Sequence, residues 1–288
     1  MRQKATRSVG LIGYPLQHSF SPVFQQAAFD YYSLPVTYVL WETPPNQLEQ
    51  AVARLRLPEC LGANVTIPHK EAVIPLLDEL DEQAAEIGAV NTILNRAGTL
   101  TGYNTDASGF LQALERDGGF EPFDKSVVII GAGGVARAAA VALLRGGVAR
   151  LTVCNRHLGR AEALVGFLAG KGFQAALSAC SQERRTLPKA LETCDLIVNA
   201  TSVGMNHGSA PHRSPLPAVL IPENVLVFDL VYNPLVTTLL RDAAARGART
   251  LNGLAMLVYQ GAAAFEIWTG KQAPLGLMFE RLRRVFVE

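Results

Sequence analysis

Two short polar segments of the chain carry side chains that could transfer a proton. Lys70 ends the segment that starts at Gly62, in which an amide, a hydroxyl and an ammonium follow a predicted strand. Asp106 ends the segment that starts at Gly102. An aspartate can orient an ammonium, and the ammonium can donate a proton to a developing alkoxide. Taken separately, the two residues are better explained as a surface lysine and an Asx turn, so the hypothesis requires the fold to bring them together.

Asparagine and threonine side chains occupy the same predicted strand ends. Asn64 and Thr66 precede Lys70, and Asn91 follows Gly88. Solvated loops more often carry Lys, Glu and Ser, whereas Asn and Thr hold a polyhydroxylated ring through directed hydrogen bonds. These residues therefore predict a site for a small hydroxylated ligand.

A carboxylate site is predicted where the first strand leads into the first helix. Ser19 and Ser21 are two residues apart, so their hydroxyls point the same way if the segment is extended. We expect Ser21 to be the N-cap of a helix whose first residue is Pro22. Hydroxyl donors beside a helix N-terminus can bind a carboxylate without an arginine. The alternative is that Ser21 only caps the helix and Ser19 belongs to an ordinary loop.

Histidines and cysteines do not predict a metal or redox centre. His18 and His69 lie beside the stronger candidates but have no clear carboxylate partner in the sequence, and the spacing of His207 and His212 fits no zinc pattern. We expect reduced, buried thiols, as in a cytosolic protein, because no CxxC pair occurs. The four cysteines are Cys60, Cys154, Cys180 and Cys194.

A nucleotide-binding turn follows the apolar strand at 127–130. Gly131 allows a tight turn, Gly133 lets the backbone approach a pyrophosphate, and Ala136 keeps the next helix close to the sheet. The strand–turn–helix context supports a glycine pattern that is weak by itself. The predicted pyrophosphate-binding residues are Gly131, Ala132, Gly133, Gly134, Val135 and Ala136.

The end of the second strand of this region predicts the cofactor. An acid at that place would bind the ribose 2′-hydroxyl of NAD and repel the 2′-phosphate of NADP. This chain has Asn155, Arg156 and His157 there, with Arg160 one turn later and no acid among them. Guanidinium groups favour a phosphate, so the predicted cofactor is NADP.

Length and composition indicate a two-domain globular protein. The chain has 288 residues, of which 49% are hydrophobic and 18% charged, and its net charge of +1 gives no electrostatic case for nucleic acid or a membrane surface. The basic N-terminus lacks the apolar stretch of a signal peptide, and no apolar run reaches membrane-spanning length. We expect a cytoplasmic protein, and a homodimer is compatible with the sequence.

From residue 126 the apolar pattern predicts a doubly wound parallel sheet of the α/β class. Before it lies a different αβ region that includes a hairpin, and a helix over 107–117 links the two. Two C-terminal helices, from Gly253 to Trp268 and over 275–287, are expected to pack back onto the first region. The segment 206–217 is predicted to be a mobile loop. Predicted strands cover 8–12, 36–40, 61–65, 91–95, 100–102, 127–130, 151–154, 174–177, 195–199, 225–230 and 250–251, and helices in the first region cover 22–32, 47–55 and 71–77.

The ordered set of motifs closely resembles the shikimate dehydrogenase family over nearly the whole chain. The motifs are GYPLQHSFSP, GANVTIPHKE, GAVNT, GYNTDASG, GAGGVARA, CNRHLGRA, NATSVGM, VYNP and NGLAMLVYQGAAAF. The resemblance implies a substrate-binding catalytic domain over 1–106, with helices of 254–288 packing back onto it. It also implies a Rossmann-type NADP domain over 107–253 and an active site between the two. The implied reaction is the reversible NADPH-linked reduction of 3-dehydroshikimate to shikimate, in the pathway through chorismate to aromatic amino acids.

The same resemblance implies a role for each matching residue. Lys70 would be the catalytic acid–base group and Asp106 its partner. The 2′-phosphate would be bound by Asn155 and Arg156, near Arg160. Substrate would be bound by Ser19, Ser21, Asn64, Thr66, Asn91, Tyr232 and Gln260, and the adenosine or nicotinamide ends of the cofactor by Thr201, Ser202, Val203, Gly253 and Met256.

Two departures and two alternatives qualify this reading. His157 replaces a usual threonine, which removes a hydroxyl donor to the phosphate, and Ala107 replaces a common glycine. One alternative is a quinate/shikimate dehydrogenase with relaxed cofactor use, which an acid after the second strand would support. The other is a non-catalytic NADP-sensing regulatory module, which could lose Lys70 or Asp106 freely.

Overall fold

The computed structural model describes residues 7–181, 187–208 and 210–286. The chain forms two units, one of residues 1–109 and 258–288 and one of residues 110–257. Each boundary lies inside a helix, α4 (Asp106–Gln112) or α9 (Leu254–Thr269). The expected boundaries, after 106 and after 253, are the starts of these two helices.

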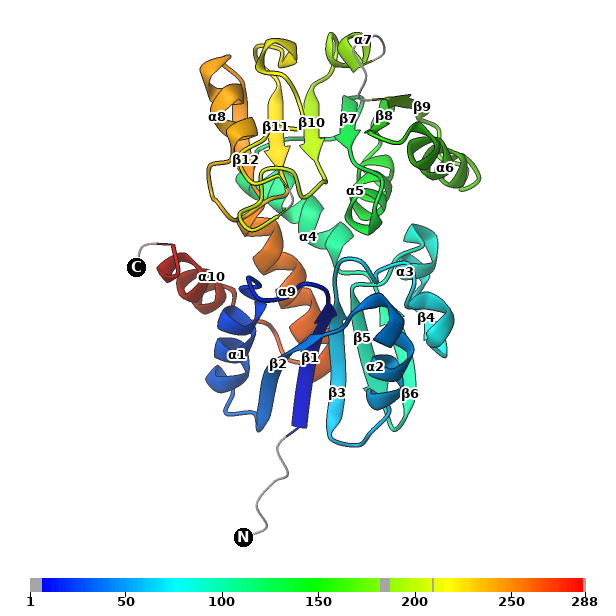
Figure 1. Ribbon diagram of the computed structural model, residues 1–288, viewed down its shortest axis with the longest axis vertical. Coiled ribbons are helices and arrows are strands. Elements are labelled where there is room, and N and C mark those ends of the chain that lie inside the picture. The colour runs from blue at the N-terminus through cyan, green and yellow to red at the C-terminus, as the bar shows by residue number, and fades with distance from the viewer. Residues whose placement is uncertain (1–6, 182–186, 209, 287–288) are drawn as a thin grey trace. The chain divides into compact units, whose positions relative to one another are not determined.

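The first unit is built on a mixed sheet in the order β2-β1-β3-β5-β6-β4 (Figure 1). Parallel pairing joins β1 to β2 and β3, whereas β5 is antiparallel to β3 and β6. The predicted hairpin is β5–β6, whose turn uses the left-handed residues Ala97 and Gly98. The strands are β1 (Arg7–Gly13), β2 (Val36–Glu42), β3 (Cys60–Val65), β4 (Glu79–Leu80), β5 (Thr92–Arg96) and β6 (Thr99–Tyr103).

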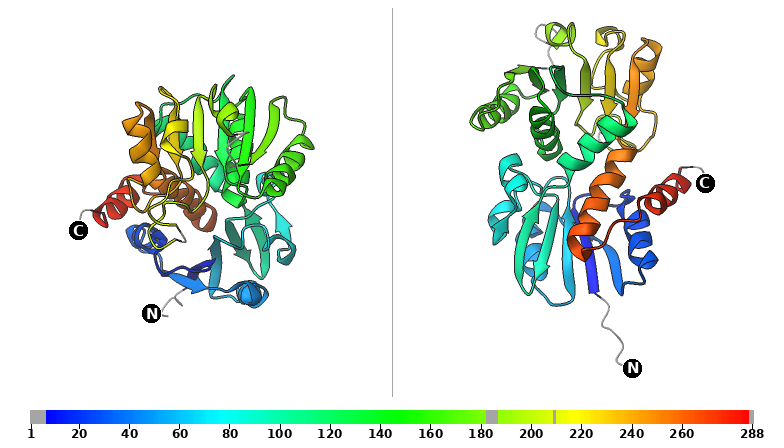
Figure 2. Two further views of the ribbon diagram at one scale, coloured as in Figure 1. Left: turned by 45° about the horizontal axis from the view of Figure 1, so that its top comes forward. Right: turned by 180° about the vertical axis from the view of Figure 1, so that it is seen from behind.

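Helices cover both faces of this sheet, as Figures 1 and 2 show for α2 and α9. On one face Leu48 and Val52 of α2 pack with Ala63 and Val65 of β3. On the other face Trp268 of α9 fills the space beside Gly62, where a Cβ would lie 2.7 Å from the indole nitrogen. The helices that lie wholly in this unit are α1 (Ser21–Tyr31), α2 (Leu48–Arg54), α3 (Glu82–Ile87) and α10 (Leu275–Arg284). The unit also contains parts of α4 and α9, whose bounds are given above.

Two expectations for the first unit are wrong, and two short elements are additional to those expected. The segment 71–77 forms turns and a short 3₁₀ helix (Ile74–Leu76), because Pro75 has no N–H to continue an α-helix. The short elements β4 and α3, which follow it, were not expected. Ser21 is the first residue of α1 and not its N-cap, so the segment holding both serines is not extended there.

The second unit is a six-stranded sheet in the order β12-β11-β10-β7-β8-β9, with every pair parallel. The order reverses between β7 and β10, which confirms the doubly wound Rossmann-type fold. Because the strands are parallel, their carboxyl ends share one edge of the sheet. The strands are β7 (Ser126–Ile130), β8 (Arg150–Asn155), β9 (Ala176–Ser181), β10 (Leu196–Asn199), β11 (Leu226–Asp229) and β12 (Arg249–Asn252), and the helices are α5 (Gly134–Arg145), α6 (Leu158–Ala169), α7 (Leu187–Leu191) and α8 (Thr238–Ala245). The expected linking helix is α4 followed by a π-helical turn (Ala113–Asp117).

The thiol expectation is wrong for one pair of cysteines. Cys154 of β8 and Cys180 of β9 occupy paired register positions and form a disulfide. The two residues are 26 apart in the sequence, so only the strand register reveals that they are neighbours. Cys60 and Cys194 are free, and burial raises the pKa of the Cys194 thiol to about 12.

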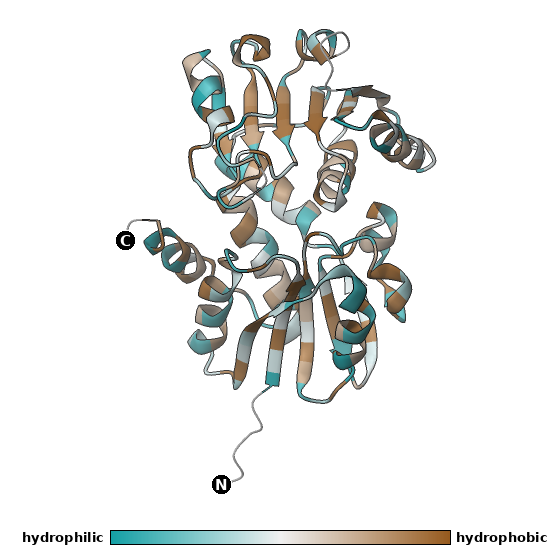
Figure 3. Cartoon of the chain, viewed as in Figure 1, coloured by the Kyte–Doolittle hydropathy of each residue, from teal (hydrophilic) through white to brown (hydrophobic). Residues whose placement is uncertain are grey.

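Apolar residues concentrate in the strands, and polar residues lie on the outer helix faces (Figure 3). The strands of the parallel sheet are covered by helices, which explains their nearly continuous apolar character. Among the described helices, none has the length and apolar content needed to cross a membrane.

Candidate active site

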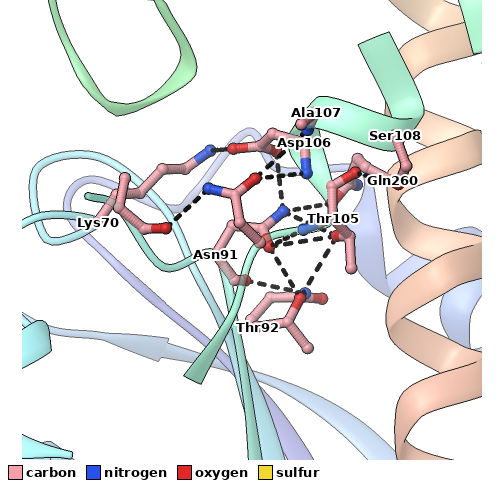
Figure 4. Close-up of polar contacts among 11 residues, drawn as sticks. Lys70, Asn91, Thr92, Thr105, Asp106, Ala107, Ser108 and Gln260 are labelled. Carbon is pink, nitrogen blue, oxygen red and sulfur yellow. Dashed lines mark hydrogen bonds and ion pairs between the residues drawn. The ribbon is translucent and has the colours of Figure 1, made fainter. Parts of the chain in front are cut away.

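Lys70 and Asp106 form an ion pair in the first unit. Lys70 Nζ lies 2.5 Å from Asp106 Oδ2, and the two side chains are 14% and 5% exposed (Figure 4). The fold brings together residues that are 36 positions apart. One N–H of the ammonium is directed at Asp106, so two others remain for a ligand. The arrangement can hold an ammonium in a fixed direction and deliver a proton from it.

Asn91 orients the carboxylate of Asp106. Its Nδ2 donates to Asp106 Oδ1 at 2.8 Å, and its Oδ1 accepts from the backbone N–H of Thr105 at 2.8 Å (Figure 4). A carboxylate can only accept and a backbone N–H can only donate, so the orientation of this amide is unambiguous. Nδ2 also lies 2.9 Å from Thr105 Oγ1 and 3.3 Å from Gln260 Oε1.

A second amide holds the backbone at Asp106. Asn104 Oδ1 accepts from the N–H groups of Asp106 and Ala107 at 3.0 and 3.3 Å, and its Nδ2 donates to Ala89 O at 2.8 Å. Asn104 is 3% exposed, so these bonds are shielded from water. Ala107, which stands where a glycine is common, is 2% exposed and does not have a positive φ, so its backbone conformation does not require glycine.

Asn64 and Thr66 lie at the end of β3, close to the same network. Asn64 accepts from the hydroxyl of Tyr38 and donates to Asn91 O and Thr92 Oγ1 at 2.8, 3.2 and 3.1 Å. Thr66 is half-buried, and its methyl carbon would lie 2.4 Å from a Cβ at Gly13.

The two serines sit at the start of α1 with different surroundings. Ser19 Oγ accepts from the backbone N–H of Ser21 at 3.3 Å, so Ser19 takes over part of the capping expected of Ser21. The Ser21 hydroxyl makes no hydrogen bond within the described residues, although Ser21 is only 8% exposed. The Ser21 oxygen is not one of the fully buried side-chain atoms that lack a partner, so its hydroxyl is open to water or to a ligand.

His69 has a structural partner. Its Nε2 donates to Thr43 O at 2.7 Å, because a carbonyl can only accept, and the residue is 1% exposed. The ring therefore anchors the turn before Lys70 to the end of β2. The site residues not predicted from the sequence are Tyr38, Thr92, Asn104 and Thr105. Thr92 lies within the GAVNT motif, and Asn104 and Thr105 lie within the GYNTDASG motif, whereas Tyr38 carries no signal in one sequence.

The glycine turn of the second unit fits a dinucleotide. Gly131 has φ of 116°, which favours glycine, and a Cβ there would lie 2.9 Å from Ala200 O. A Cβ added at Gly133 would meet no atom within 4 Å, so packing does not require glycine there. Gly133 is the N-cap of α5, and Ala136 is fully buried. The open cradle at the helix N-terminus fits a pyrophosphate.

Exposed cations lie at the end of β8. Arg156 and Arg160 are exposed, and neither forms an ion pair with another described residue. Asn155 Nδ2 donates to His157 O at 3.0 Å, which closes the turn into α6. No acid stands at 155–160, so this turn fits the 2′-phosphate of NADP.

The loop after β10 is shaped by a buried network. Asn199 Oδ1 accepts from the N–H and the hydroxyl of Thr201 at 3.1 and 2.7 Å, and Asn199 Nδ2 donates to Asp229 at 2.8 Å. Thr237 donates to the other carboxylate oxygen of Asp229 at 2.6 Å. Burial raises the pKa of Asp229 to about 6. The Thr201 hydroxyl thus serves the loop, and Ser202 and Val203 follow it half-buried.

Three further predicted residues lie near the ends of β11 and α9. Gly253 packs against β11, since a Cβ there would lie 2.1 Å from Leu230 O, which explains the glycine without a ligand. Met256 is 6% exposed. Burial raises the pKa of the Tyr232 phenol to about 12, and a tyrosine is a neutral phenol at neutral pH with or without this shift.

Family models match three segments of the chain. The shikimate dehydrogenase substrate binding domain matches residues 11–93, the shikimate/quinate 5-dehydrogenase model matches residues 118–210, and the shikimate 5′-dehydrogenase C-terminal domain matches residues 253–283.

Individual relatives cover nearly the whole chain. Shikimate dehydrogenase (NADP(+)) of Moorella thermoacetica is 46% identical over 279 residues, which is 97% of this chain and 93% of that protein. Shikimate 5-dehydrogenase from Thermus thermophilus, solved in complex with NADP(H) and shikimate, is 41% identical with a TM-score of 0.84 over 96% of this chain and 99% of that one. Quinate dehydrogenase from Corynebacterium glutamicum, in complex with NAD, is 33% identical with a TM-score of 0.84 over 97% and 99%. By its sequence, its fold and these matches, the chain belongs to the shikimate dehydrogenase family.

Proposed function

We propose that this protein catalyses the reversible NADP(H)-dependent reduction of 3-dehydroshikimate to shikimate, a step towards chorismate and the aromatic amino acids. The observation that carries the proposal is the Lys70–Asp106 pair, 2.5 Å apart and mostly buried in the first unit. Its relatives named shikimate dehydrogenase (NADP(+)) support the reaction and the cofactor.

Lys70 and Asp106 perform the proton transfer. NADPH supplies the hydride that reduces the ring ketone. Lys70 donates a proton from Nζ to the oxygen that becomes the alcohol, and in the oxidative direction it takes that proton back. Asp106 stays an acceptor that directs the ammonium, and Asn91 holds Asp106 from the other side. Removal of water from this site favours the transfer, because electrostatic contacts strengthen at lower polarity.

The proposed substrate-binding residues orient the substrate by binding its carboxylate and its ring hydroxyls. Ser19 and Ser21 donate to the substrate carboxylate, and the Ser21 hydroxyl has no hydrogen bond to another described residue that would compete with this contact. Asn64, Thr66 and Asn91 take the ring hydroxyls, with Gln260 beside Asn91. Tyr232 donates to the carboxylate as a neutral phenol. Residues 1–106 with 254–288 are accordingly proposed as the substrate-binding domain.

The second unit is proposed to bind NADP through residues 107–253. Backbone N–H groups of Gly131–Ala136 bind the pyrophosphate, and Asn155, Arg156 and Arg160 bind the 2′-phosphate. Thr201, Ser202, Val203, Gly253 and Met256 line the remaining parts of the cofactor. Intact Lys70 and Asp106 argue against a regulatory module, and the absence of an acid at 155–160 argues against relaxed use of NAD.

Location and assembly complete the proposal. We place the enzyme in the cytoplasm, because its reaction consumes NADPH, a coenzyme of the cell interior. We propose a homodimer as its assembly, which a light-scattering measurement of molar mass tests.

The test of the reaction is an absorbance assay at the NADPH band with four substrate pairs. Shikimate and quinate are each supplied with NADP and with NAD. We expect fastest turnover with shikimate and NADP. Turnover with quinate and NAD as fast as with shikimate and NADP would support the quinate/shikimate alternative, and no turnover with any pair would support the regulatory alternative.

A further inference from the structure

The hydroxyl of Tyr38 reaches Asn64 across one strand of the first unit. Tyr38 lies on β2, in register across β1 with Gly62, two residues before Asn64. Its ring packs near Trp268, with 6.4 Å between centroids, and its N–H donates to Gln26 at 2.8 Å. The hydroxyl lies 2.8 Å from Asn64 Oδ1, and Tyr38 is 6% exposed. Packing and backbone pairing therefore fix the place of this hydroxyl.

The surroundings of Asn64 assign a direction to every one of its hydrogen bonds. Both N–H groups of the amide are used, one by Asn91 O at 3.2 Å and one by Thr92 Oγ1 at 3.1 Å. A backbone carbonyl can only accept, so Nδ2 must face Asn91 and Oδ1 must face Tyr38. Tyr38 therefore donates. One lone pair of Oδ1 stays available, and Asn64 can act towards a ligand only as an acceptor.

We propose that Tyr38 is a positioning residue that holds Asn64 as an acceptor-only contact for one ring hydroxyl of the substrate that is not oxidised. The acceptor-only contact admits a hydroxyl, which can donate, and disfavours a carbonyl, an ether or a halogen at the same ring position. This inference rests on the proposed shikimate site. The contact is the same before and after hydride transfer, because the hydroxyl it binds does not react. Its loss should therefore raise KM and leave kcat almost unchanged.

Wild-type enzyme tests the direction of the hydrogen bond. The probes are shikimate analogues in which one of the unoxidised ring hydroxyls is replaced by hydrogen or by fluorine, which accepts but does not donate. At the position bound by Asn64, both replacements should raise KM by a similar factor, about three- to tenfold for one neutral hydrogen bond. In Asn64→Ala this penalty should disappear. A fluorine analogue that binds as well as shikimate at every position would overturn the acceptor-only assignment.

Tyr38→Phe tests the positioning role, because it removes only the hydroxyl. We expect KM for shikimate to rise about three- to tenfold, with kcat and KM for NADP within about twofold of wild type. Tyr32→Phe is the matched control: it removes a tyrosine hydrogen bond of 2.8 Å to Gln272 O in the same unit, away from the polar network. Equal effects of the two variants on KM would show that Tyr38 is merely structural.

Combining the substitutions tests whether Tyr38 acts through Asn64. In the Asn64→Ala background, Tyr38→Phe should change KM no further. Independent, multiplying effects would contradict the proposal. These outcomes are separate from the failure of the proposed function, since that failure would be the absence of shikimate oxidation in the wild type itself.

Discussion

The proposed catalytic network of the first unit and the proposed cofactor edge of the second use polar groups in opposite ways. In the first unit, Asn91, Asn64 and Asp106 are almost saturated by hydrogen bonds to other residues. In the second unit, Arg156 and Arg160 form no ion pair with described residues. An acid–base group needs a fixed direction, which neighbours provide, whereas an anion site needs donors that are not already used.

The largest effect is expected when the oriented ammonium is removed. Lys70→Ala should lower kcat by a factor on the order of 10²–10⁴, the range for a general acid–base group, with a much smaller change in substrate binding. Lys125→Ala is the control, because Lys125 also pairs with an aspartate, at 3.7 Å, but in an exposed place. Near-wild-type turnover of Lys70→Ala would remove Lys70 from the mechanism.

A charge reversal at the second unit should change cofactor choice. Arg156→Asp should lower the ratio of kcat/KM for NADP over NAD by about a hundredfold, since a charged hydrogen bond contributes roughly 1.5–3 kcal/mol and repulsion adds to its loss. Arg241→Asp, on the exposed face of α8, serves as the control. A variant that keeps the wild-type ratio would show that Arg156 does not contact the phosphate.

The serines at α1 test whether unused donors also bind an anion in the first unit. Ser19→Ala combined with Ser21→Ala should weaken shikimate binding by about ten- to hundredfold, from roughly 1.5–3 kcal/mol for hydrogen bonds to a charged group. The effect should largely vanish for an analogue without the carboxylate. An equal loss for both ligands would assign the serines a structural role only.

The smallest effect concerns stability and Asp229. The pKa of this residue rises from 3.8 to about 6 in the folded protein, so the folded state binds the proton more tightly than the unfolded state. Stability is therefore highest below pH 4 for this group and decreases as pH rises to about 6, by on the order of 1–3 kcal/mol. Urea unfolding from pH 4.5 to 7.5 measures the decrease, which Asp229→Asn should remove and Asp242→Asn should leave unchanged.

Sequence patterns predict the strands of each sheet better than the side-chain contacts that depend on how those strands pair. Apolar runs such as 127–130 and the glycines at 131 and 133 predict the parallel sheet and its nucleotide turn, because burial on both faces of a strand leaves a continuous apolar run. The helix expected at 71–77 does not form, because Pro75 has no N–H to continue an α-helix.

Strand register accounts for most of what a single sequence did not reveal. The Cys154–Cys180 disulfide depends on the pairing of β8 with β9. The contact between Tyr38 and Asn64 depends on three paired strands. The capping role moved from Ser21 to Ser19 because α1 begins one residue earlier than expected, a shift that local propensity does not resolve.

The central claim is that Lys70 and Asp106 act as one unit, and a double-mutant cycle on kcat tests it most directly. Lys70→Ala and Asp106→Asn are measured singly and together with saturating shikimate and NADP. We predict that the double variant loses no more activity than the more damaging single variant, because Asp106 acts by directing the ammonium of Lys70. Losses that multiply in the double variant would show that the two residues act independently and would contradict the account.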